Sequence, residues 1–120
     1  MRKLVLLLIL VVLIPNNLIL SEKTSEEELP PRFKIWLEEE VGYIISPREK
    51  EVFQKLQSDR EREFFMEAFW KQRDPTPGTP ENEFKTEHYR RIQYANHTYG
   101  RSTVKPGWKT DRGRIYIILG

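Results

Sequence analysis

The chain has 120 residues, of which 38% are hydrophobic and 32% are charged, and it contains no cysteine. This length allows about one domain, and the lack of cysteine excludes disulfides, cysteine-based zinc sites and thiol catalysis. The net charge is only +2, and the chain has no recognisable nucleic-acid-binding motif, so we expect no nucleic-acid partner.

Charge is unevenly distributed along the chain. Residues 22–70 hold 13 acidic and 8 basic side chains, whereas residues 85–120 hold 8 basic and 2 acidic side chains. The two regions could attract each other as packed helix faces, or the second could bind an anion. We favour attraction between packed faces.

The N-terminus has the pattern of an export signal. Arg2 and Lys3 precede a continuous apolar run, Leu4–Ile14, which is shorter than the ~20 residues of a membrane span. Residues 1–21 are therefore predicted to be a signal peptide. Ile19 is too large for the −3 position of a cleavage site after Ser21, so an uncleaved membrane anchor is the alternative. Residues 22–30 are polar and acidic and are predicted to be a linker.

Helical patterns dominate the following region. Ser46 and Ser58 each precede a helix and are followed three residues later by a glutamate, as in a capping box. Thr79 is the expected cap of a further helix that starts at Pro80 and ends before Gly100. The predicted helices cover residues 31–41, 47–57, 59–73 and 80–99.

The apolar positions of these helices recur at helical spacing and predict a core. Trp70 is expected to cover the end of this core, and His88 lies on an apolar stripe, where we expect a core histidine rather than a ligand. Between the last two helices, Arg73 and Asp74 stand at the start of a stiff loop with three prolines, the first of them Pro75. Asp74 is expected to organise this turn.

The C-terminal stretch combines turn signals with an apolar run. Pro106–Gly107 and Thr110–Gly113 are predicted turns, in which Gly107 and Gly113 supply backbone conformations that side chains disfavour. Arg114–Leu119 is rich in β-branched and aromatic residues and is predicted to be a strand. Helices followed by a strand predict an α+β fold in which the strand is the first of a sheet.

Two of these segments resemble a known family. "GWKTD" at 107–111, continued by "RGRIYIILG", resembles the signature of the GWxTD domain, and "FWKQRDPTPGTPENEFKTEHYRRIQYAN" at 69–96 resembles the helical segment of that family. The resemblance covers residues 36–120 and implies an exported or envelope location in bacteria. It implies no particular reaction. Family domains continue beyond the strand, so we expect residues 31–120 to be the N-terminal part of a larger domain.

Few polar residues are candidates for chemistry, and two hypotheses account for them. In one, Asp111 is a base or metal ligand, His88 a second ligand and Arg73 an anion clamp. In the other, the motif is a structural corner in which Asp111 accepts turn hydrogen bonds or pairs with Arg73. We favour the corner because no hydrolase, metalloprotease or phosphate-binding motif is present.

The motif residues are accordingly assigned structural roles, and no catalytic residue, metal ligand or cofactor is assigned. Trp108 either packs back onto the helices or serves a functional surface, and we favour packing. The assigned residues are Trp70, Arg73, Asp74, Pro75, Gly107, Trp108, Thr110, Asp111 and Gly113.

The function that follows is interaction or scaffolding by an exported or membrane-anchored envelope domain. Its surfaces would be the proline-rich loop and the GWKTD corner, expected to be adjacent, and its partners an envelope protein and the membrane. The alternative is a fragment of an exported hydrolase or metal-dependent enzyme with its other site residues beyond Gly120.

Overall fold

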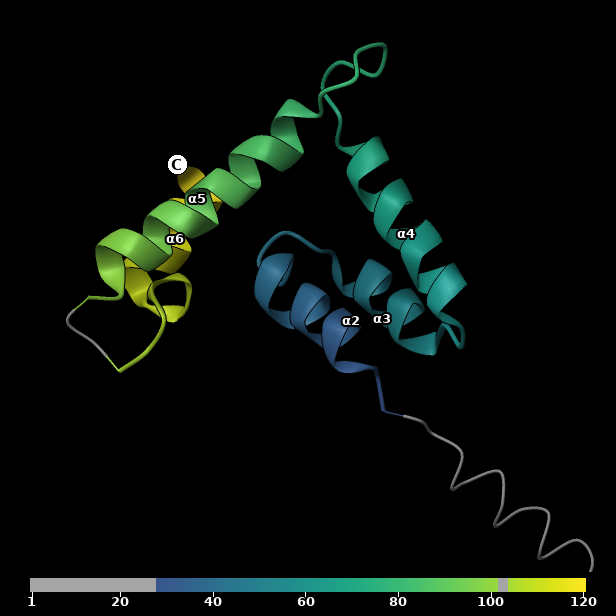
Figure 1. Ribbon diagram of the computed structural model, residues 1–120, viewed down its shortest axis with the longest axis horizontal. Helices are drawn as coiled ribbons and strands as arrows, with labels where there is room; N and C mark the ends of the chain where they lie inside the picture. Colours follow the sequence, from purple (N-terminus) through teal and green to yellow (C-terminus); the bar gives the residue numbers. More distant parts are fainter. Residues whose placement is uncertain (1–27, 102–103) are drawn as a thin grey trace, which may run out of the picture.

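The computed structural model describes residues 28–101 and 104–120, and its regular elements there are all helical. In chain order they are α2 (Pro31–Ile35), the π-helical η1 (Trp36–Glu40), α3 (Pro47–Lys55), α4 (Asp59–Gln72), α5 (Glu83–Tyr99), the 3-10 turn η2 (Gly107–Lys109) and α6 (Asp111–Leu119). Figure 1 shows two groups of helices: α2, α3 and α4 in one, and α5 with α6 alongside it in the other.

The prediction of an α+β fold is wrong, because these two ranges contain no β-strand. The expected strand Arg114–Leu119 lies in α6. Thr110 caps this helix, since its hydroxyl accepts a hydrogen bond from the Gly113 N–H at 3.0 Å. A helix satisfies its backbone groups internally, whereas a strand needs a neighbour that the described chain does not offer. The helix cost of β-branched residues, at most about 0.7 kcal/mol each, is small enough for capping and packing to override.

Helix starts follow local cap chemistry where the sequence makes it explicit. Ser46 forms a complete capping box with Glu49, which confirms the predicted start of α3. Ser58 accepts a hydrogen bond from the Glu61 N–H at 3.2 Å and caps α4, also as predicted. The predicted start of α5 is wrong: Asn82 is its cap, accepting from the Lys85 N–H at 3.0 Å.

The core of the first group is aromatic. Trp36 lies at its centre, with ring centroids 5.1 Å from Phe53, 5.3 Å from Phe69 and 6.3 Å from Phe65. Trp70, expected in the core, is 6% exposed and packs 5.0 Å from Phe69. The buried residues of this cluster are Phe33, Trp36, Leu37, Val41, Phe53, Phe69 and Trp70.

Helix α5 contacts the first group through a few specific bonds. Asn82 Nδ2 donates to the Trp70 carbonyl at 2.7 Å, and the Tyr89 hydroxyl donates to Glu40 Oε1 at 2.7 Å. His88 is 4% exposed, its Nε2 lies 2.6 Å from the Glu40 carbonyl oxygen, and burial lowers its pKa. A neutral His88 therefore donates to Glu40, which is the role of a core histidine.

The predicted export segment, residues 1–21, and most of the predicted linker lie outside the described residues. Within residues 28–101 and 104–120, no helix has both the length and the hydropathy that crossing a membrane requires.

Candidate functional site

The GWKTD corner returns the chain from the end of α5 onto the side of the same helix, where α6 begins (Figure 1). A Cβ atom on Gly107 would lie 1.9 Å from the Ala95 carbonyl oxygen, and one on Gly113 would lie 1.9 Å from the Gly107 carbonyl oxygen. Neither glycine has a positive φ angle, so the predicted reason for these glycines is wrong. They are required because three backbone segments approach too closely for any side chain.

Hydrogen bonds hold this corner together. The Thr110 hydroxyl donates to the Gly107 carbonyl at 2.7 Å while it caps α6, and the Trp108 N–H donates to Asn96 Oδ1 at 2.8 Å. Sequence reasoning did not identify Asn96 as part of the corner. Its only signal was a position in the last two turns of the predicted helix, where a polar side chain can reach the returning chain.

Trp108 connects the corner to the first group of helices. Its carbonyl accepts a hydrogen bond from the Tyr43 hydroxyl at 2.9 Å, and the two rings lie 5.9 Å apart. Burial raises the pKa of Tyr43, and the half-buried indole packs against the segment that follows η1. Trp108 thus contacts a turn of the first group of helices, where packing onto the helices themselves was expected.

The predicted pair between Asp111 and Arg73 does not form. Arg73 donates to Glu49 Oε1 at 2.7 Å and Oε2 at 3.1 Å, and its guanidinium lies 3.7 Å from the Phe69 ring centroid. The hydrogen bond from Arg73, with those from Ser46, lowers the pKa of Glu49 to about 2. Asp111 is exposed in the first turn of α6, where its charge complements the helix dipole.

The proline-rich loop and the corner are not adjacent, contrary to expectation. Asp74 Oδ1 accepts from the Thr76 N–H at 3.0 Å and organises the loop, which leads into the N-terminus of α5 with Pro75 exposed. The corner instead packs against Ala95 and Asn96 near the C-terminus of the same helix. Figure 1 shows the two features at opposite ends of α5.

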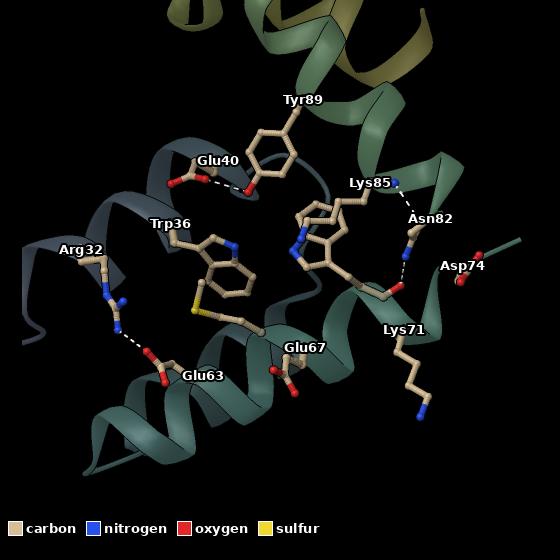
Figure 2. A pocket seen from close by; sticks show the side chains of 12 residues that line it. Arg32, Trp36, Glu40, Glu63, Glu67, Lys71, Asp74, Asn82, Lys85 and Tyr89 are labelled. Carbon is tan, nitrogen blue, oxygen red and sulfur yellow. Dashed lines mark hydrogen bonds and ion pairs between the residues drawn. The ribbon is translucent and has the colours of Figure 1, made fainter. Parts of the chain in front are cut away.

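A groove of about 570 Å³ opens between η1, α4 and α5. Figure 2 shows the side chains that line it. Its apolar surface comes from Trp36, Met66 and Trp70, with Tyr89 on the α5 side. The polar and charged lining residues are Arg32, Glu40, Glu63, Glu67, Lys71, Asp74, Asn82 and Lys85.

Trp36 forms part of the buried floor of this groove. The side chain is 2% exposed, and its indole Nε1 is buried. The Tyr89 hydroxyl donates to Glu40, and its oxygen interacts with the Trp36 indole N–H; burial and the bond to Glu40 raise the pKa of Tyr89 well above its ordinary value, against a smaller lowering effect of Trp36.

Of the residues singled out in the sequence, Trp70 and Asp74 line the groove, and five form the corner. Trp36, Met66 and Tyr89 were missed as site residues. The available signal was spacing: Trp36 and Glu40, Met66 and Trp70, and Lys85 and Tyr89 are three pairs at i and i+4, each on one helix face. Across the described ranges, no three His, Asp or Glu side chains form a group that could hold a metal ion.

The comparisons with known proteins bear on this arrangement. The family model of the GWxTD domain matches residues 23–120. No curated protein and no solved structure matches the chain. The family match spans most of the chain and contains both the corner and the groove, and the chain therefore belongs to the GWxTD domain family.

Proposed function

We propose that this GWxTD domain is exported, remains free or membrane-anchored in the cell envelope, and acts there as an interaction or scaffolding domain. The groove between η1, α4 and α5 is the observation that carries the proposal. Its volume lies within the range of ligand sites, about 300–1,000 Å³, and its floor is made of large apolar side chains.

Interaction suits the described polar groups better than catalysis does. Arg73 is bound to Glu49, His88 to the Glu40 carbonyl, and Thr110 to the backbone of the corner. Each of these side chains already has a structural partner. Aromatic residues and methionine, which dominate the groove floor, are the types enriched at protein interfaces.

The export part of the proposal depends on Arg2, Lys3 and the apolar run Leu4–Ile14. Residues 1–30 fused to a reporter active only outside the cytoplasm should give activity. A matched fusion carrying Leu8→Asp in the apolar run should lose it. A reporter that stays silent with the natural segment would contradict export.

The interaction part can be tested by photocrosslinking in the envelope of the producing cell. A photoreactive residue replaces Glu67, an exposed residue lining the groove, or Gln54, which is exposed on α3 outside the groove. We expect one envelope protein to be crosslinked from position 67 and not from position 54. Equal crosslinking from both positions would show that the groove is not the contact surface.

A further inference from the structure

We infer that the outer face of α6, the side of this helix turned away from α5, binds the headgroup layer of an anionic lipid bilayer. This inference goes beyond the proposed function, because none of the α6 residues lines the groove and the binding does not depend on export. Three observations support it: an exposed apolar stripe, arginines on both flanks of that stripe, and basic charge that the fold leaves without ion pairs.

Helix α6 is apolar on two sides. Gly113 and Ile117 are buried on the side that packs against α5. The outer side carries Ile115, Ile118 and Leu119, which are 59%, 44% and 76% exposed and whose spacing of three and four residues places them on one face. Ile118 also borders a hollow of about 300 Å³ beside α5, so Ile115 and Leu119 are the most exposed members of the stripe. The stripe protrudes from a convex helix surface, which suits a soft partner that closes around it.

Basic side chains surround this stripe. At 3.6 residues per turn, Arg112 lies on one flank beside Leu119 and Arg114 on the other beside Ile118, and Lys109 stands just before the helix; all three basic residues are exposed. Arg114 lies 5.6 Å from the Tyr43 ring centroid, which leaves its charge in place. None of the three forms an ion pair within the described residues, so the attraction between packed faces that the sequence favoured is not made by these side chains. The acidic residue of α6 is Asp111, whose charge the helix dipole already offsets.

This combination of charge and apolar surface fits an anionic bilayer. An interfacial helix inserts its apolar stripe at the boundary between headgroups and acyl chains, while basic side chains on its flanks reach the lipid phosphates. The planar guanidinium groups of Arg112 and Arg114 match the geometry of phosphate oxygens. A symmetric contact between two copies of the chain would bring the same arginines together, and like charges repel. The charge on the flanks therefore favours the lipid surface over a second copy.

A fluorescent label on α6 tests the inference. The full chain contains no cysteine, so Ile115→Cys gives a single attachment site for the polarity-sensitive dye NBD, and Gln93→Cys, exposed on α5, gives the control site. Residues 1–21 can attach the chain to any vesicle, but a dye at position 115 reports only the contact of α6. With vesicles of phosphatidylcholine and phosphatidylglycerol, we expect the emission at position 115 to shift to shorter wavelength, and the emission at position 93 to stay in place. Salt at about 1 M shortens the Debye length to about 3 Å and should reverse the shift.

Substitutions in the labelled chain test the two parts of the surface separately. Arg112→Gln and Arg114→Gln should each lower the ratio of shifted to unshifted dye by about fivefold, the contribution of one basic side chain at an anionic surface. Arg48→Gln, which removes an exposed arginine on α3, should leave the ratio unchanged. Leu119→Ser should lower it by at least about fourfold, the contribution of one buried CH₂ group. All of these side chains are exposed, so the variants are expected to fold.

Three results would overturn the inference. The first is an unshifted dye at position 115 with anionic vesicles. The second is an equal shift with vesicles of phosphatidylcholine alone, which would show that the arginines do not select the lipid. The third is a shift that grows with protein concentration in the absence of lipid, which would show that a second copy covers the stripe. Each of these results would leave the proposals for export and for the groove as they stand.

Discussion

At the residue scale, the motif glycines are explained by the space around them. Gly107 and Gly113 lie where α5, η2 and α6 meet, and each would place a Cβ 1.9 Å from a backbone oxygen. Backbone cannot move aside as the end of a flexible side chain can. Gly78 in the proline-rich loop differs, because its Cβ would meet nothing within 4 Å.

This contrast predicts that Gly113→Val lowers the free energy of unfolding by at least about 2 kcal/mol, because it overpacks a fixed site. Gly78→Val is the matched control, and its change should stay within about 0.5 kcal/mol. Urea denaturation of both variants measures the difference. A Gly113→Val protein as stable as the natural chain would refute the close-approach explanation.

His88 predicts a pH dependence of stability. Burial lowers its pKa below the ordinary 6.5 in the folded state, so the unfolded chain binds the proton more readily. The free energy of unfolding should therefore fall as pH falls below about 6.5. Glu49 changes the stability only at lower pH, between its ordinary pKa of 4.5 and its folded pKa of about 2. Measurements from pH 5 to 7.5 therefore isolate the contribution of His88.

In that range His88→Asn should remove most of the slope, measured by thermal unfolding at each pH. His97, exposed on the same helix, is the matched control. His97→Asn should keep the natural slope. A slope that survives in His88→Asn would assign the dependence to another group.

At the scale of elements, local chemistry could be read from the sequence and long-range packing could not. The starts of α3 and α4 were predictable because Ser46 and Ser58 act on backbone three residues away. The start of α5 was misplaced because Thr79–Pro80 is as good a local signal as Asn82. The residue types of Arg114–Leu119 favour a strand, but the Thr110 cap and packing against α5 make the segment helical.

Thr110 is therefore expected to contribute through its hydroxyl, which caps α6 and also bonds to the Gly107 carbonyl. Thr110→Ala should lower the free energy of unfolding by about 1–2 kcal/mol, the range for a lost N-cap. Thr110→Ser keeps the hydroxyl and should cost less than half as much. Chemical denaturation compares the two, and equal losses would show that the methyl group, not the cap, matters.

At the scale of the whole molecule, two groups of helices meet at Glu40 and Trp70. Glu40 accepts from both His88 and Tyr89, and Trp70 packs 5.6 Å from the Tyr89 ring. The groove exists because these contacts hold α5 beside η1 and α4. Sequence alone did not predict it, since Trp36 and Tyr89 are far apart in the chain and meet only through this packing.

Trp70 is predicted to be the residue on which this arrangement depends most. Trp70→Ala should lower the free energy of unfolding by about 3–5 kcal/mol, as for other buried aromatic residues. Phe64, 62% exposed on the same helix, is the control, and Phe64→Ala should cost less than about 1 kcal/mol. Comparable losses in the two variants, measured by urea denaturation, would contradict the central position of Trp70.

The central claim is that the groove between η1, α4 and α5 binds a partner protein and that the GWKTD corner supports the fold. Hydrogen–deuterium exchange of the full chain, alone and bound to the partner crosslinked from position 67, tests it most directly. We predict slower exchange in η1, in the second half of α4 and in the first half of α5, with residues 107–113 unchanged. Protection confined to residues 107–113 would show that the GWKTD corner is the binding surface and would contradict this account.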